Sequence, residues 1–73
     1  MSNLLGSVEI VLNGQPRAVA AGQTLLDMVL SLELEPSRVA LELDGQIVKR
    51  DLWAVTPLRQ GARVELVHFV GGG

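Results

Sequence analysis

The chain has 73 residues, of which 48% are hydrophobic and 19% charged, a composition typical of one small globular domain. It has no cysteine and a single histidine, His68, which excludes disulfides, thiolate metal sites and a Cys–His catalytic pair. Its net charge of −2 argues against a nucleic-acid partner, because neutralising phosphates requires a basic surface. We therefore expect no enzyme, no catalytic residue and no bound metal or cofactor.

No uninterrupted apolar run is longer than that of residues 18–21, which is far too short to cross a membrane. The first residues lack the basic and apolar segments of an export signal. These two observations predict a cytoplasmic protein with no membrane partner.

The first predicted element is a hairpin. Residues 8–12 place apolar side chains at alternate positions, as in a strand buried on one face. Asn13-Gly14 then predicts a two-residue turn, because both residues accept positive φ. Residues 17–20 would return as an edge strand, where the missing N–H of Pro16 is tolerated.

A helix is predicted next, because Thr24 and Asp27 have the spacing of a capping box. The apolar side chains that follow recur at helical spacing and predict the face turned to the core. This face consists of Leu25, Met28, Val29 and Leu32.

Pro36 cannot continue the helix, which we expect to end near Leu34. Leu26 and Leu30 lie off the apolar face. They either flank a wide core face or form an exposed contact for a partner.

Two further strands follow. Residues 39–43 alternate between apolar and other side chains, Asp44-Gly45 predicts a second hairpin turn, and residues 47–48 begin a short strand. Residues 49–60 show no period and predict an ordered connection. The side chains expected to anchor this connection in the core are Trp53 and Leu58.

Residues 63–70 alternate strictly and predict the last strand. If Val64 and Leu66 face the helix, His68 has the same buried parity and a structural role. The opposite face then carries Val67 and Phe69.

The element order ββαβββ predicts an α+β fold of the β-grasp, or ubiquitin-like, type, with a mixed sheet of about five strands wrapped around one helix. The first and last strands would lie side by side at the centre of the sheet. Residues 1–70 would form this domain, and residues 71–73 a flexible glycine tail.

The three terminal glycines, Gly71, Gly72 and Gly73, are the one feature that the fold does not require. They are either a frayed end or a segment that threads a channel too narrow for any Cβ. In the second case they would deliver the α-carboxylate of Gly73, which is ionised at neutral pH. Attack of this carboxylate on the α-phosphate of ATP would give an acyl-adenylate, which a sulfur or nitrogen nucleophile can displace.

The sequence resembles the ThiS family, the sulfur carrier proteins of thiamine biosynthesis. Four segments carry the resemblance together with Gly72-Gly73. They are Ala-Gly-Gln-Thr-Leu at 21–25, Asp-Gly-Gln-Ile-Val at 44–48, Arg-Asp-Leu-Trp at 50–53 and Val-Glu-Leu at 64–66. Lys49 and Ala62 depart from the family, which often has proline and aspartate there, and both departures concern local turns.

The resemblance implies a carrier that is itself the substrate of other enzymes. A ThiF/MoeB-like adenylyltransferase would use MgATP to adenylate Gly73. A persulfide donor of the cysteine desulfurase or rhodanese type would convert the terminus to a thiocarboxylate. Thiazole synthase, ThiG, would then take up the sulfur. The carrier itself would bind no cofactor.

The outward parity of the last strand predicts where these enzymes dock. Exposed apolar side chains beside the reactive end would form a hydrophobic contact for the activating enzyme and the synthase. The predicted contact residues are Val67, Phe69 and Val70. In the alternative, strand parity shifts near the end and Phe69 is a core residue.

Three other functions share parts of this pattern. The small subunit of molybdopterin synthase has the same activation chemistry, but usually has prolines shortly before its glycines, and residues 63–70 contain none. A ubiquitin-like modifier would instead join its tail to lysines of other proteins. A plain β-grasp interaction domain would not need its glycines at all.

Overall fold

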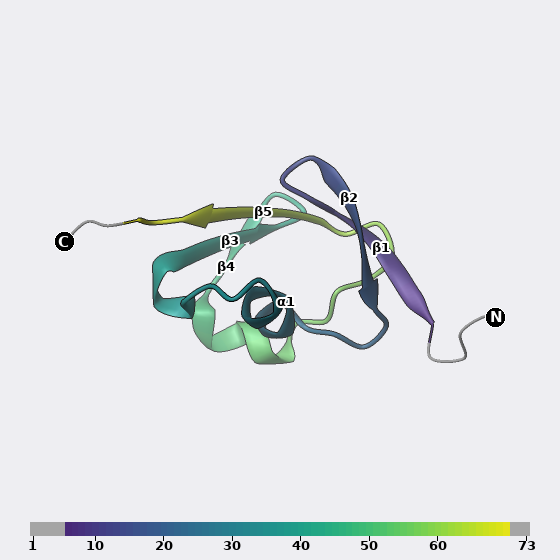
Figure 1. Cartoon of the computed structure of the whole chain (residues 1–73), viewed down its shortest axis with the longest axis horizontal. Coiled ribbons are helices and arrows are strands. Elements are labelled where there is room, and N and C mark those ends of the chain that lie inside the picture. The colour runs from purple at the N-terminus through teal and green to yellow at the C-terminus, as the bar shows by residue number, and fades with distance from the viewer. Residues whose placement is uncertain (1–5, 71–73) are drawn as a thin grey trace.

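The computed structural model describes residues 6–70, which form a five-stranded mixed sheet in the order β2-β1-β5-β3-β4 wrapped around helix α1 (Figure 1). This is the predicted β-grasp arrangement. The elements in chain order are β1 (Ser7–Leu12), β2 (Gln15–Ala20), α1 (Leu25–Ser31), the 3₁₀ helix η1 (Pro36–Arg38), β3 (Val39–Leu43), β4 (Gln46–Val48), the 3₁₀ helix η2 (Arg50–Val55) and β5 (Arg63–His68).

The predicted hairpin of β1 and β2 is confirmed. The two strands pair antiparallel from Ser7↔Ala20 to Leu12↔Gln15, and Asn13 and Gly14 both have positive φ, 50° and 81°. Positive φ at both central residues matches the right-handed twist of the flanking strands. Pro16 lies in β2 at the edge of the sheet, where a proline is tolerated.

Strand β5 lies at the centre of the sheet, as predicted. It pairs parallel with β1 through Val11↔Arg63 and Leu12↔Val64, and antiparallel with β3 from Leu43↔Val64 to Val39↔His68. The last strand is therefore held on both sides over its first half. Its second half, beyond the level of Leu12, is paired with β3.

Helix α1 begins with the predicted capping box. The Thr24 side chain accepts a hydrogen bond from the Asp27 backbone N–H, and the Asp27 carboxylate accepts one from the Thr24 N–H. The first and second turns bury Leu25, Met28 and Val29 completely against the sheet. The capping box thus places the helix in the register in which its apolar face meets the sheet.

The end of the helix differs from the prediction. It stops at Ser31 rather than near Leu34, because Glu33 adopts a left-handed conformation with φ of 61°. The N–H of Leu34 donates to Val29 O and the N–H of Glu33 donates to Leu30 O, the two bonds of a Schellman motif. This turn brings Leu34 back onto the core. The helix thus ends three residues before Leu34, the position near which the proline would have ended it.

The connection between β4 and β5 is ordered, as predicted, and contains a 3₁₀ helix that the sequence did not reveal. Trp53 is 1% exposed and Leu58 3% exposed, which confirms both as anchors. The indole Nε1–H of Trp53 donates to Val48 O at 2.9 Å. These anchors hold η2 on the same side of the sheet as α1 (Figure 1).

The core lies between the sheet and these two helices. Its members come from the sheet and from the helical layer. No helix covers the opposite face of the sheet in the described part of the chain (Figure 1). The core consists of Ile10, Val19, Leu25, Met28, Val29, Val39, Leu41, Trp53, Leu58, Ala62 and Val64.

Candidate partner-binding surface

The alternation of β5 decides which of its side chains can meet a partner. Val64 is fully buried and Leu66 is partly buried against the core, whereas Glu65 and Val67 are exposed on the other face. The parity predicted for Val67 is thus confirmed. After β5 ends, the N–H of Phe69 donates to Arg38 O at 2.8 Å, which holds the chain beside η1 for one further residue.

The three predicted contact residues are all exposed to solvent. Val67 is 54% exposed, Phe69 55% and Val70 75%, so the alternative in which Phe69 belongs to the core is wrong. These side chains lie in the last four described residues, directly before Gly71 in the sequence. Clustered apolar side chains exposed on a small domain are typical of a protein-binding surface. Their role in binding stays a prediction.

The expectation for His68 is wrong. It pairs opposite Val39, which is buried, yet its own side chain is exposed. The reason is the length of β1, whose pairing with β5 ends at Leu12↔Val64 and leaves His68 without a neighbouring strand on that side. His68 belongs to the exposed end of β5 and not to the core.

Two hairpin turns hold β5 through side chains, a feature that the sequence analysis missed. The Asn13 side-chain amide accepts from Leu66 N–H through Oδ1 at 2.7 Å and donates to Leu66 O through Nδ2 at 3.1 Å. Asp44 accepts from Arg63 N–H through Oδ1 at 2.9 Å and donates to Arg63 O through its own N–H at 2.8 Å. Each turn thereby satisfies both backbone groups of one β5 residue.

The sequence signal for these bonds is the presence of Asn13 and Asp44 at the first position of the two turns, which turn formation explains without any bond to β5. Asn and Asp favour the first position of such turns because they tolerate positive φ. Glycine tolerates positive φ as well, so the turn conformation alone does not require a side chain at Asn13 or Asp44. Their side chains can therefore form hydrogen bonds outside the turns. Here both side chains anchor the strand that leads to the C-terminal glycines.

The remaining predicted positions divide as follows. Leu26 is partly buried against the core and flanks it, whereas Leu30 is 52% exposed. The predicted tail, residues 71–73, with Gly73 as the predicted site of modification, lies outside the described residues. Within residues 6–70, no three His, Asp or Glu side chains gather where they could hold a metal ion. None of the helices described is long and apolar enough to span a membrane.

Residues 10–73 match the ThiS family. The chain belongs to this family. It is 32% identical to the sulfur carrier protein ThiS of Escherichia coli, over 90% of this chain and 100% of that protein. It also resembles the thiazole synthases of Magnetococcus marinus and Paramagnetospirillum magneticum, at 36% and 30% identity over 90% of this chain. This chain spans about a fifth of the length of these two synthases, 20% in each case.

Solved structures give the same result for the fold. A crystal structure of the thiamine biosynthesis protein ThiS from Geobacter metallireducens superposes with a TM-score of 0.76 at 28% identity, covering 90% of this chain and 100% of that one. A ubiquitin-like domain from tubulin-binding cofactor B superposes with a TM-score of 0.53 at 22% identity, covering 92% of each chain, and supports the fold alone.

Proposed function

We propose that this chain is a sulfur carrier whose terminal glycine is activated by adenylation, converted to a thiocarboxylate and used by a thiazole synthase. The match to the ThiS family over residues 10–73, which extends to the last glycine, carries the proposal. The two thiazole synthases that contain a segment similar to this chain support the assignment of the sulfur acceptor.

The proposed chemistry takes place at the carboxylate of Gly73. This carboxylate attacks the α-phosphate of ATP, forming an acyl-adenylate and releasing pyrophosphate. The terminal sulfur of a donor persulfide then displaces AMP and gives an acyl disulfide. A second thiol of the donor cleaves the S–S bond, which leaves one sulfur on Gly73 as the thiocarboxylate and the donor as a disulfide.

The residues of this chain present the terminus and leave catalysis to the partners. Strand β5 is anchored by Asn13 and Asp44, so the chain leaves the sheet from a fixed position. The exposed side chains of Val67, Phe69 and Val70 would seat the activating enzyme and the synthase around the glycines. MgATP would be bound by the activating enzyme.

Intact-mass spectrometry tests this function. The chain is incubated with a ThiF-type activating enzyme, MgATP and a persulfide donor. We expect a gain in mass that corresponds to replacement of one oxygen by sulfur, and no gain when Gly73 is deleted. Transfer of the sulfur from the loaded carrier to thiazole synthase, and not to a molybdopterin synthase large subunit, would assign the pathway. Equal ATP–pyrophosphate exchange with the full-length and truncated chains would contradict the proposal.

A further inference from the structure

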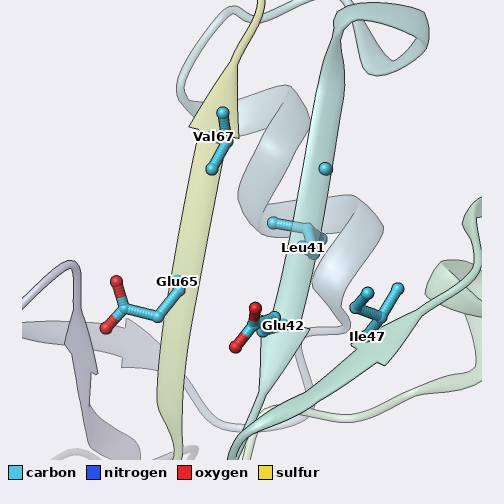
Figure 2. Close-up of a pocket in the computed structure, with 6 residues that line it drawn as sticks. Leu41, Glu42, Ile47, Glu65 and Val67 are labelled. Atoms are coloured by element: carbon cyan, nitrogen blue, oxygen red, sulfur yellow. The ribbon is translucent and has the colours of Figure 1, made fainter.

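The second half of β5 continues beyond the strand that supports its first half. Parallel pairing with β1 ends at Leu12↔Val64, whereas pairing with β3 continues to His68. Figure 2 shows Val67 on this part of β5, with β3 on one side and no strand on the other. Strands that are paired on one side only twist more strongly than strands inside a sheet. The path of β5 beyond Val64 therefore depends on what takes the place of β1.

The side chain of Asn13 takes the place of β1 at this point. Its Oδ1 accepts from Leu66 N–H at 2.7 Å, and its Nδ2 donates to Leu66 O at 3.1 Å. Its backbone N–H donates to Val64 O at 2.8 Å. Asn13 thus bonds with its backbone where β1 ends and extends the support of β5 to Leu66 with its side chain. Within residues 6–70, no bond from this side holds β5 beyond Leu66.

A further bond holds the chain three residues later, from the opposite side. The N–H of Phe69 donates to the backbone oxygen of Arg38, which directly precedes β3. Because β5 lies between β1 and β3, Leu66 and Phe69 are held from opposite sides of the strand. Figure 1 shows the chain leaving the domain in the direction of β5. Two bonded residues on opposite sides therefore fix the direction in which the chain approaches its glycines.

We propose that Asn13 is a positioning residue for the adenylation of Gly73. It fixes the end of β5 before any enzyme binds, and so lowers the conformational entropy lost when the activating enzyme takes up the terminus. The proposal rests on the proposed function and adds to it a residue that is far from the glycines in sequence. Asn13 acts through Leu66 and touches neither ATP nor the reacting carboxylate.

This role acts on binding of the carrier and not on the chemical step. Without the two bonds to Leu66, the end of β5 samples many directions, and only a fraction of them admits the glycines to an active site. The apparent affinity falls in proportion to that fraction. Once the terminus is bound, the activating enzyme itself orders it and supplies the reacting groups. Loss of Asn13 should therefore raise KM for the carrier and leave kcat nearly unchanged.

ATP–pyrophosphate exchange by a ThiF-type activating enzyme, measured over a range of carrier concentrations, tests the proposal. Asn13→Gly keeps the left-handed backbone and removes both bonds to Leu66. We expect KM for this variant to rise about tenfold and kcat to stay within about twofold of the wild-type value. Asn13→Asp lacks the donor to Leu66 O and should raise KM as well.

A control of reduced stability separates positioning from a merely structural role. Val29→Ala removes buried methyl groups of α1 and leaves every hydrogen bond of β5 in place. We expect a wild-type KM for this control at a temperature at which its circular dichroism spectrum is native. If Asn13→Gly does not fold at that temperature, it is combined with Glu33→Gly, which removes a left-handed glutamate just beyond α1.

Three results would overturn the proposal. They are a wild-type KM for Asn13→Gly, an equal increase in KM for Asn13→Gly and Val29→Ala, and a fall in kcat at unchanged KM. The wild-type chain separates these results from a failure of the carrier function. If it supports exchange and Asn13→Gly has the same KM, the positioning role alone is wrong. If it supports no exchange with an enzyme that adenylates its own carrier, the proposed function itself fails.

Discussion

The two hairpin turns, Asn13–Gly14 and Asp44–Gly45, have nearly the same backbone conformation and hold β5 by different means. Asn13 and Asp44 both have a φ of 50°. At Asn13 the side-chain amide supplies both the donor and the acceptor for Leu66. At Asp44 the backbone N–H supplies the donor, and the carboxylate supplies only the acceptor for Arg63.

This difference explains why the first turn needs an amide side chain, whereas a carboxylate is sufficient at the second. Parallel pairing of β1 with β5 ends at Leu12↔Val64, so Leu66 has no β1 residue opposite it. An amide side chain offers a donor and an acceptor and can replace the missing strand residue, which a carboxylate cannot do. Arg63 already receives a backbone donor from Asp44, so one acceptor oxygen is sufficient there.

Replacement of each left-handed residue by glycine keeps the backbone conformation and isolates the side chain. The largest effect is expected for Asn13→Gly, which loses both bonds to Leu66. We expect a loss of about 2 kcal/mol in the free energy of unfolding. Urea denaturation followed by the fluorescence of the single tryptophan, Trp53, measures this loss. A variant as stable as the wild type would show that water replaces the amide without cost.

Asp44→Gly should have a smaller effect, because it removes one hydrogen bond and keeps the backbone N–H that donates to Arg63. We expect a loss of about 1 kcal/mol. Asp44→Asn is the matched control, since its amide oxygen can still accept from Arg63 N–H and its stability should stay close to that of the wild type. An equal loss in the free energy of unfolding for Asp44→Gly and Asn13→Gly would contradict the difference between the two turns.

Glu33 is the third non-glycine residue with positive φ among those described, and the same substitution should have the opposite sign there. Its side chain has no hydrogen bond or ion pair in the described part of the chain. The left-handed conformation therefore carries its steric cost without a compensating bond. We expect Glu33→Gly to stabilise the protein by about 0.5–1 kcal/mol. A decrease in the urea midpoint would assign the Glu33 side chain a role that the contacts do not reveal.

The smallest effect on stability is expected at the end of β5, beyond both turns. Phe69→Asp should change the free energy of unfolding by less than about 0.5 kcal/mol, because the side chain is more than half exposed. It should nevertheless weaken binding to the activating enzyme and to the synthase. Leu52→Asp is the matched control, with a similar exposure of 49% on the helical side of the sheet. Loss of the native circular dichroism spectrum in Phe69→Asp would mean that Phe69 stabilises the fold.

Much of the fold could be predicted because its signals are local. Alternation, the two turn dipeptides and the capping box depend on neighbouring residues, and each was found near its expected place, although β5 ends at His68 and not at residue 70. The end of α1 was placed wrongly because glutamate rarely takes the position that Glu33 occupies, and the return of Leu34 to the core decides that turn. Residues 50–55 form a 3₁₀ helix without a period of their own, since the burial of Trp53 holds them.

Part of the candidate site could also be predicted, because its signal is local. Strand parity, a local property, was enough to place Val67 on the outer face. His68 has the parity of a buried residue, but its exposure depends on where β1 stops. Asn13 and Leu66 are separated in sequence and become neighbours only through the pairing of β1 with β5.

The sequence by itself determined the order of the elements, the two turns and the glycine terminus, because each is written in residues that are adjacent or a few positions apart. Only the tertiary structure decided that Asn13 and Asp44 anchor β5, and that the side chain of Asn13 takes the place of β1 beside Leu66. Both arrangements depend on strand register, which is set by the packing of the whole sheet against α1.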